Sequence, residues 1–263
     1  MQDEIGAKTT LTYWDAQQDA LPNTRWFSPF DSGTRALLRL IARNTAPGSS
    51  FLEIGCAPGK MLAYAAMKCG ARVAGIDYSP RGISISRRFH RANRIASDLR
   101  AEDVMETSFA PASFDCVFSA GLVEHFDDPR PVVAKHVELA RPEARIVVAI
   151  PNYGGIYGRM QAKRDPANLA IHNLAIMSPP ALAELFDPAT VESVEAFPIG
   201  PPSLWGVTLN KPLLQRAAGV IGNLLPVIPA LAPCLAAVAI RRSHCSGANP
   251  RGRHRLADAT RRR

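Results

Sequence analysis

The sequence predicts an α/β fold, with a mostly parallel sheet and helices on both of its faces, from three observations. Between residues 50 and 150, short runs rich in β-branched residues alternate with helical stretches, the pattern of parallel strands joined by crossover helices. The chain has 263 residues, of which 47% are hydrophobic, enough to bury one large core. No internal repeat divides it. We therefore expect one domain over residues 1–242, with its core at 34–152.

The first elements follow from local patterns. Leucine and isoleucine recur at helical spacing over residues 34–44, which predicts a helix entering the domain. Strands are then expected at 50–55, 72–76, 97–101, 114–119 and 145–150, and helices at 59–69, 80–93 and 129–140. Ser79 and Pro80 are a typical N-cap and first helical residue, so they define the start of the helix at 80–93 well.

The pattern loosens after Pro151 into a stretch rich in glycine and proline. We expect a short helix at 179–186 and two final strands at 191–197 and 234–240, which bring the sheet to seven strands. The apolar segment 212–232 is inserted between these two strands. Residues 153–232 are expected to form the substrate side of the domain.

The net charge of +8 is concentrated at the end of the chain. Residues 241–263 contain eight arginines and one aspartate, which leaves +1 for residues 1–240. Because residues 243–263 have almost no aliphatic side chains, we expect a disordered basic tail. Its arginines favour a solvated end over a nucleic-acid site, although they leave open a tether to RNA or anionic lipid.

The cysteines and the first residues of the sequence indicate where in the cell we expect the protein. The five cysteines are an odd number without a CxxC pair, which argues against a disulfide framework and a cysteine zinc site. The polar start, residues 1–4, is followed by no apolar run, so we expect no secretory signal and a cytoplasmic location.

Residues 217–240 carry no charge and are long enough to span a bilayer as a helix. Pro226, Pro229 and Pro233 interrupt this segment, and each would break helical hydrogen bonds. We therefore expect 212–232 to cover the substrate pocket or to contact a membrane peripherally.

The strongest motif is the run from Phe51 to Lys60, an apolar strand that ends in a glycine turn and opens a helix. Glu53, Gly55 and Gly59 give the spacing Glu-x-Gly-x-x-x-Gly, and the glycines let backbone approach a ligand closely. Asp77 ends the next strand, 18 residues after Gly59, where a carboxylate can accept both hydroxyls of a ribose. The motif therefore predicts a nucleoside cofactor.

Two cofactors use such a motif. A nicotinamide dinucleotide requires Gly-x-Gly-x-x-Gly to hold its pyrophosphate, but Ala57 occupies the place of the second glycine. S-adenosylmethionine has no phosphate, and its ammonium group needs an acceptor that Glu53 and nearby carbonyls can supply. The spacing favours S-adenosylmethionine and leaves an NAD-dependent oxidoreductase as the alternative.

With these blocks, residues 50–152 resemble the class I S-adenosylmethionine-dependent methyltransferases, of the small-molecule type 11 or ubiquinone-biosynthesis-like group. The segment 101–104, Ala-Glu-Asp-Val, is similar to the acidic block after the third strand, and 113–126 is similar to the fourth-strand block. The resemblance implies a Rossmann-like sheet of seven strands with an antiparallel last strand. It also implies that Asp103 bonds the adenine amino group and that 119–122 line the methionine end.

The cofactor-binding residues expected from the motif and the resemblance are Glu53, Gly55, Cys56, Gly59, Asp77, Tyr78, Asp103, Val104, Ser119 and Ala120. One block departs from the family pattern, because Glu143 and Ala144 replace the two glycines that usually follow Pro142. We expect this departure to alter a surface turn and to leave the cofactor site unchanged.

The resemblance implies methyl transfer to an oxygen, nitrogen or carbon atom of an acceptor. The many apolar residues of 199–232 favour a hydrophobic small molecule or lipid-like acceptor. Two other classes remain open: an RNA or protein methyltransferase recruited by the basic tail, and a binding module without catalysis.

Several side chains are candidates for the acceptor side. His125 follows the fourth strand and is the candidate general base, because an imidazole titrates in a useful range. His172 and Asn173 are further candidates for contact with an acceptor hydroxyl, and Tyr13 and Trp14 for an N-terminal lid or for core packing. No metal site is expected, since the histidines and carboxylates lack close ligand spacing.

Overall fold

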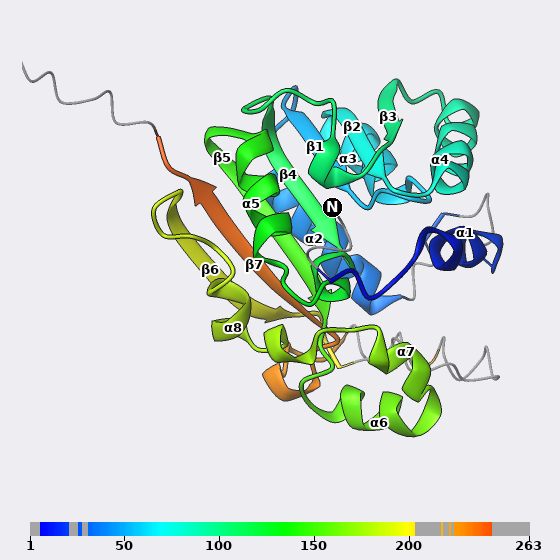
Figure 1. Cartoon of the computed structure of the whole chain (residues 1–263), viewed down its shortest axis with the longest axis vertical. Helices are drawn as coiled ribbons and strands as arrows, with labels where there is room; N and C mark the ends of the chain where they lie inside the picture. Colours follow the sequence, from blue (N-terminus) through cyan, green and yellow to red (C-terminus); the bar gives the residue numbers. More distant parts are fainter. Residues whose placement is uncertain are drawn as a thin grey trace, which may run out of the picture.

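The computed structural model describes residues 6–20, 26–27, 31–202, 217, 221 and 224–243. These residues form one seven-stranded sheet with helices on both sides (Figure 1). The sequence-based predictions for residues 203–216 and for the tail from residue 244 onward lie outside the described residues.

The strand order is β3-β2-β1-β4-β5-β7-β6. The strands are β1 (Ser50–Ile54), β2 (Arg72–Asp77), β3 (Ser97–Ala101), β4 (Phe114–Ala120), β5 (Ala140–Pro151), β6 (Val191–Ile199) and β7 (Cys234–Arg241). Neighbours among the first five strands pair in parallel, and β7 runs antiparallel to both β5 and β6. The predicted sheet, with its antiparallel last strand, is confirmed.

From β1 to β3 successive strands are added toward one edge of the sheet, whereas β4 lies on the other side of β1 and the later strands are added toward the opposite edge. The direction in which the sheet grows therefore reverses between β1 and β4. At such a reversal the connections leave the sheet on opposite faces, and a crevice opens beyond the carboxyl ends of the strands. Four of the five residues of β1 are buried, so this strand lies in the interior of the molecule. The crevice is therefore the expected place for a ligand.

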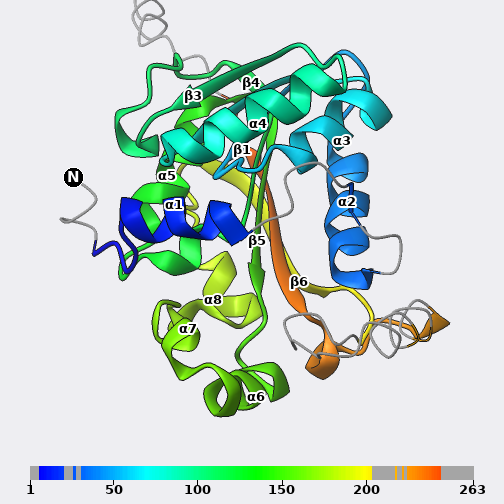
Figure 2. The same ribbon diagram turned by 90° about the vertical axis from the view of Figure 1, so that its right-hand side faces the viewer.

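The helices cover the two faces of the sheet. They are α2 (Ser32–Asn44), α3 (Lys60–Cys69), α4 (Pro80–Ala92), α5 (Arg130–Leu139) and α8 (Pro179–Ala183). Leu40 of α2, Leu62 of α3 and Ile83 of α4 share one core with one face of the sheet. Val133 of α5 and Leu182 of α8 share the other core, and Figure 2 shows these two helices across the sheet from α2 and α3.

Caps at the helix starts agree with the sequence. Ser79 is the N-cap of α4, and its hydroxyl accepts a hydrogen bond from the Gly82 amide at 2.8 Å. Asp31 caps α2 by accepting from the Thr34 amide at 3.0 Å. These side chains satisfy amide groups that the first turn of a helix leaves unpaired.

Three helices were not predicted: α1 (Leu11–Ala20), α6 (Ile156–Arg164) and α7 (Pro166–Ala170). None of them has a broad apolar face, which is the signal that sequence reasoning uses. Four short 3-10 turns complete the described structure: η1 (Val104–Glu106), η2 (Val123–His125), η3 (Leu174–Ile176) and η4 (Pro229–Leu231).

Strand β5 begins five residues earlier than expected. An irregularity in the pairing with β4 allows this, because Phe114 pairs with Ala140 whereas Cys116 pairs with Arg145. Glu143, within the irregularity, has a φ of +65°, in the left-handed region where glycine is favoured. Glu143, which replaces the first glycine of the family pattern, thus adopts the left-handed backbone conformation that the turn requires.

An N-terminal segment, residues 6–20, is attached beside the loop after β4. The Lys8 amide donates to the His125 carbonyl at 2.8 Å, and the Asp127 amide donates to the Gly6 carbonyl at 2.9 Å. The Lys8 ammonium also pairs with the Asp127 carboxylate at 2.6 Å. These bonds place α1 across the ends of the central strands (Figure 2).

In the described part of the chain, no helix has the length and apolar character needed to cross a membrane. The end of the uncharged segment 217–240 is β7, which pairs on both sides within the sheet. Just before it, Leu224 is 82% exposed and Val227 is 49% exposed, so part of the apolar insertion faces solvent.

Candidate active site

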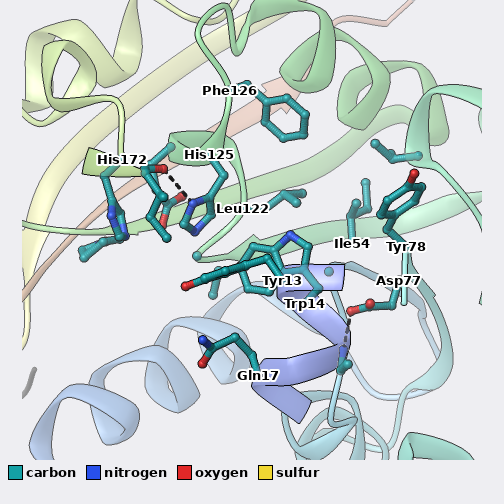
Figure 3. A pocket seen from close by; sticks show the side chains of 18 of the residues that line it. Tyr13, Trp14, Gln17, Ile54, Asp77, Tyr78, Leu122, His125, Phe126 and His172 are labelled. Atoms are coloured by element: carbon teal, nitrogen blue, oxygen red, sulfur yellow. Dashed lines mark hydrogen bonds between the residues drawn. The ribbon is translucent and has the colours of Figure 1, made fainter. Parts of the chain in front are cut away.

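A cavity of about 400 Å³ opens at the carboxyl ends of β1, β2, β4 and β5. This volume lies within the usual range for small-molecule sites, about 300–1,000 Å³. Figure 3 shows its two ends, with Asp77 and Tyr78 at one and His125 and His172 at the other. Leu122 and the aromatic residues of α1 lie between them.

The first end is lined by residues that follow strands β1 and β2. Gly55 has a φ of +76°, and its amide donates to the Ile76 carbonyl at 2.8 Å. This conformation turns the chain away from β1 without placing a side chain in the cavity. Ile54, Ile76 and Val104 add apolar wall.

Asp77 is the polar group of this end. Its Oδ2 accepts from the Ala57 amide and its Oδ1 from the Ser79 amide, both at 2.9 Å. Burial raises the pKa of Asp77, and the two amide bonds offset part of that rise. Each carboxylate oxygen keeps a lone pair after these bonds, so Asp77 can accept two further hydrogen bonds from a ligand.

Five of the ten expected cofactor residues line the cavity: Gly55, Asp77, Tyr78, Val104 and Ala120. The other five are not among the residues that line it.

Three of those five belong to the segment that runs from β1 to the start of α3. The Glu53 carboxylate is 4% exposed and accepts from the Leu62 amide at 3.1 Å, and burial raises its pKa well above the usual value. Cys56 is buried in the core. Gly59 has a φ of +83°, and a Cβ there would lie 3.0 Å from His90 Nε2. The need for glycine at 59 thus comes from its backbone and from packing on α4.

The remaining two have partners within the protein. Asp103 caps η1 by accepting from the Met105 amide at 2.9 Å, and the neighbouring Glu102 lines the cavity in its place. The Ser119 hydroxyl lies 2.9 Å from His136 Nε2 in the buried core. Direct cofactor contacts by Glu53, Cys56, Gly59, Asp103 and Ser119 stay predictions.

The second end of the cavity contains His125 and His172, which come from η2 and from the loop after α7. Their ring centroids are 4.7 Å apart, and Tyr153 packs edge-on against His172 at 5.0 Å. Burial lowers the pKa of His125 to about 4 and also lowers that of His172. Both rings are therefore neutral near pH 7.

Asn173 does not line this cavity. Its side-chain amide donates to the carbonyls of Phe126 and Asp127, both at 3.0 Å, and its Oδ1 accepts from the Ala175 amide. The side chain holds the loop after η2 in place. Of the two acceptor-side candidates in this loop, the fold brings His172 to the cavity.

Glu124, beside His125, is completely buried and lines the cavity. Within the described residues, neither of its carboxylate oxygens has a hydrogen-bond partner. Burial raises the pKa of Glu124 to about 8, and the nearby backbone amides of Leu122 and Glu124 offset only part of this effect. An unpaired buried carboxylate is costly, and such groups often mark a site that a ligand completes.

Helix α1 supplies the wall between the two ends. Tyr13, Trp14 and Gln17 line the cavity, and the Trp14 ring meets His125 edge-on at 5.0 Å. Tyr13 and Trp14, expected to form a lid or to pack in the core, thus line the cavity, and their role as a lid stays a prediction. The Ser79 hydroxyl, which lies against the Asp15 carboxylate, ties α1 to the start of α4.

Sequence reasoning missed several lining residues, among them Ile54, Ile76, Glu102, Glu124 and Tyr153. Ile54 and Ile76 lie at the carboxyl ends of the parallel strands β1 and β2, so the rule that ligands bind beyond carboxyl ends could have found them. Glu124 is a carboxylate next to the apolar pair Leu122-Val123, which is a local signal of a buried charge. For Tyr153 the sequence carries no comparable signal.

Comparisons with known proteins identify the segment that carries this site. Residues 52–148 match the model of a family described as "Methyltransferase domain". The ubiquinone biosynthesis O-methyltransferase of Hahella chejuensis is 30% identical over 142 residues, which are 53% of this chain and 56% of that protein. The protein of the same name from Xanthomonas campestris is 29% identical over 112 residues, 42% of this chain and 46% of its own. The chain spans about half the length of these curated relatives.

Among solved structures, a chain of the Haloferax volcanii complex that contains the Trm112 methyltransferase activator has a TM-score of 0.62 at 16% identity. The similarity covers 89% of this chain and 98% of that one. The geranyl diphosphate C-methyltransferase of Streptomyces coelicolor, solved with Mg²⁺, geranyl diphosphate and S-adenosyl-L-homocysteine, has a TM-score of 0.54 at 12% identity, over 80% and 79% of the two chains. Identities this low show the fold alone.

The matched segment runs from β1 through β5 and thus includes the glycine turn, Asp77 and the loop after β4. The chain therefore carries a methyltransferase domain of the class I S-adenosylmethionine-dependent family.

Proposed function

We propose that the protein transfers a methyl group from S-adenosylmethionine to an oxygen, nitrogen or carbon atom of a hydrophobic small molecule. The observation that carries this proposal is the two-ended cavity, in which Asp77 and His125 line the same continuous space. A nucleoside at one end would point its reactive group toward an acceptor at the other.

The residues of the first end fit the cofactor. Two free lone pairs on Asp77 suit a pair of ribose hydroxyls, and the apolar side chains of Ile76 and Val104 suit the faces of an adenine ring. Glu102, at the same end, can accept from the adenine amino group. When bound, S-adenosylmethionine supplies an electrophilic methyl carbon whose leaving group is a neutral thioether.

The acceptor end suits a partly apolar molecule. Tyr153 and Ile171 line it beside the histidines, and Leu122 and Phe126 add apolar wall to the same cavity. Alignment of the acceptor atom with the methyl carbon can lower the barrier by several kcal/mol, on the order of the 7–11 kcal/mol reached in well-oriented reactions. Positioning by these walls is thus the first contribution of the chain to catalysis.

His125 is proposed as the general base for acceptors that must lose a proton. Its Nδ1 lies 3.0 Å from the Ile171 carbonyl, which can only accept, so Nδ1 carries the hydrogen and Nε2 is left with a lone pair. Nε2 can take the acceptor proton as the acceptor atom bonds to the methyl carbon and the carbon–sulfur bond breaks.

Calorimetry with S-adenosylmethionine tests the cofactor site. D77A and the closer mimic D77N are expected to bind S-adenosylmethionine at least about tenfold more weakly, because each of two lost hydrogen bonds to a charged group is worth about 1.5–3 kcal/mol. The exposed Asp128 gives a matched control, D128N, with unchanged affinity. Equal affinities in the wild type and both Asp77 variants would remove the assignment, and binding of NAD with no binding of S-adenosylmethionine would favour an oxidoreductase.

A labelled-methyl screen against phenols, quinols, amines and lipid extracts then identifies the acceptor. We propose a cytoplasmic enzyme that contacts membranes at most through residues 212–232. Deletion of residues 244–263 is expected to leave small-molecule methylation intact. Loss of activity on deletion, together with strongly salt-dependent RNA binding by the full chain, would favour the alternative recruited by the basic tail.

A further inference from the structure

The acceptor end of the cavity brings together three groups that each offer an atom able to bind a cation. Glu124, His125 and His172 each place one potential ligand atom within 4.8 Å of the others. Glu124 is completely buried and its two carboxylate oxygens have no partner within the described residues. The ionised form of a buried carboxyl that nearby backbone amides stabilise only in part is unfavourable, and a cation beside it would offset that cost.

Hydrogen bonds to the backbone determine which histidine nitrogens are available. His125 Nδ1 lies 3.0 Å from the Ile171 carbonyl, and His172 Nδ1 lies 2.7 Å from the Asn168 carbonyl. Because a carbonyl oxygen cannot donate, both Nδ1 atoms carry the hydrogen in the neutral rings. Both Nε2 atoms therefore have free lone pairs, and a backbone carbonyl on the far nitrogen is the usual support of a metal-binding histidine.

The separations are close to those of a metal site. Nitrogen and oxygen ligands at about 2.1 Å from one metal ion lie at most about 4.2 Å apart. In a tetrahedral site with such bond lengths the ligand atoms lie about 3.4 Å from one another, so the three groups would have to approach by up to about 1.4 Å when an ion binds. Two imidazoles and one carboxylate suit divalent first-row metals such as Mn²⁺, Fe²⁺, Co²⁺ or Zn²⁺ and leave open coordination positions.

We propose that Glu124, His125 and His172 form a binding site for a divalent first-row metal ion at the acceptor end of the cavity. The ion would neutralise the carboxylate and keep open positions toward the space that the acceptor occupies. This inference rests on the proposed function. The role of the ion would be to bind the acceptor's hydroxyl oxygen, which would make that hydroxyl more acidic before methyl transfer. The acceptor chemistry then narrows to hydroxyl groups, above all phenols or adjacent diols.

This site departs from the expectation of no metal. Sequence spacing carried no signal, because Glu124 and His125 follow β4 whereas His172 lies in the loop after α7. A metal ion at this site would also exclude His125 as the general base, since an Nε2 bound to metal cannot take up the acceptor proton. In the metal-bound enzyme His125 is a ligand, and the acceptor proton leaves to water.

The test uses the full chain, stripped with a chelator and titrated with CoCl₂. Visible absorption and calorimetry are expected to show one tight site per chain. H172A and E124Q are expected to bind Co²⁺ at least about tenfold more weakly, because even partners of metal ligands contribute 10–100-fold to affinity. Glu124 is completely buried, so E124Q can impair folding as well as metal binding. His172 is only half-buried, so H172A tests the metal site with less risk to the fold.

The exposed Glu138, which pairs with Lys135 away from the cavity, provides the matched control E138Q with unchanged Co²⁺ binding. His244 and His254 are present in every variant, so any Co²⁺ bound by these two residues contributes equally to all of the titrations. Equal Co²⁺ affinity in the wild type and H172A, or no binding in either, would overturn the metal site.

Titration of the same proteins with S-adenosylmethionine separates the two proposals. If the wild type and H172A bind S-adenosylmethionine equally and only the wild type binds Co²⁺, both proposals are supported. S-adenosylmethionine binding without Co²⁺ binding would remove the metal site alone. Co²⁺ binding without S-adenosylmethionine binding would remove the proposed function and leave the site as a metal centre.

Discussion

The rings of His125 and His172 pack with their centroids 4.7 Å apart and their planes at 50°. One ring comes from the turn after a central strand and the other from the helical insertion that follows β5. Each ring is held by a backbone carbonyl on its Nδ1, and each offers a ring nitrogen within 4.8 Å of the other and of a Glu124 carboxylate oxygen. The helical insertion therefore completes an end of the cavity that the central sheet alone would leave open.

Replacement of Trp14 by alanine is expected to lower kcat/KM by about three- to tenfold. The contact between Trp14 and His125 is an aromatic pair, and such pairs are worth about 0.5–1.5 kcal/mol. Loss of the ring would also admit water between the two ends of the cavity. Steady-state kinetics measure the effect, and W26A is the control, because Trp26 packs on Phe89 outside the cavity. An equal loss in W26A would assign the effect to stability.

Alanine substitutions at Gly59 and Gly48 are expected to distinguish the cost of backbone strain from the cost of overpacking. Both have positive φ, +83° and +76°, but a Cβ at 59 would meet His90 and Ser86 at 3.0 Å whereas a Cβ at 48 meets nothing within 4 Å. G48A is expected to lose about 1–2 kcal/mol from the left-handed backbone alone. G59A should lose a further 1–3 kcal/mol, roughly, from overpacking. Urea unfolding measures both, and equal losses would contradict the tight packing of Gly59 on α4.

Asp115 is expected to stabilise the start of β1 in a pH-dependent way. Its Oδ2 accepts from the Ser50 amide and hydroxyl at 2.8 and 2.7 Å, and its Oδ1 pairs with Arg141 at 2.9 Å. Burial alone would raise the pKa of Asp115, but these bonds outweigh it and the pKa is lowered. At pH 7, D115N should therefore cost about 1–2 kcal/mol, reduced from the full value because the carboxylate is partly exposed.

The sign of the pH effect follows from the lowered pKa. The contribution of Asp115 is present above its unfolded pKa of about 3.9 and is lost as the pH falls through the lower, folded pKa. The difference in unfolding free energy between the wild type and D115N should shrink from pH 5 to pH 2. A difference that stays constant over this range would show that the ionised form has no special role.

Replacement of Ser119 by alanine is expected to lower stability more than cofactor affinity. His136 Nδ1 lies 2.7 Å from the Val132 carbonyl, so His136 Nε2 is the acceptor for the Ser119 hydroxyl. S119A would leave that buried nitrogen unpaired, at a cost of about 1–3 kcal/mol. Thermal unfolding and calorimetry with S-adenosylmethionine measure the two effects. A stable variant with much weaker binding would instead support the direct cofactor contact that the family resemblance implies.

Local signals in the sequence were sufficient for most of the fold. The alternation of strands and helices predicted the sheet, because each crossover element has its own apolar periodicity. Ser79 and Pro80 defined the start of α4, since capping depends on neighbouring residues only. Helix α1 escaped prediction because its stability comes from contacts with η2 and α4, which are distant in sequence.

At the candidate site the same division holds. The glycine turn and Asp77 were predictable because strand, turn and carboxylate follow each other in a short stretch. The sequence did not distinguish Glu102 from Asp103, since one residue of register decides which carboxylate faces the cavity and which caps η1.

The sequence by itself determined the class of fold, the end of the cavity that Gly55 and Asp77 line, and the family. Only the tertiary structure decided that Glu124, His125 and His172 meet, and that α1 lies over them. The physical reason is that the first set depends on interactions between close neighbours in the chain. The second depends on how a helical insertion and an N-terminal helix pack onto a finished sheet, and spacing along the sequence does not encode that packing.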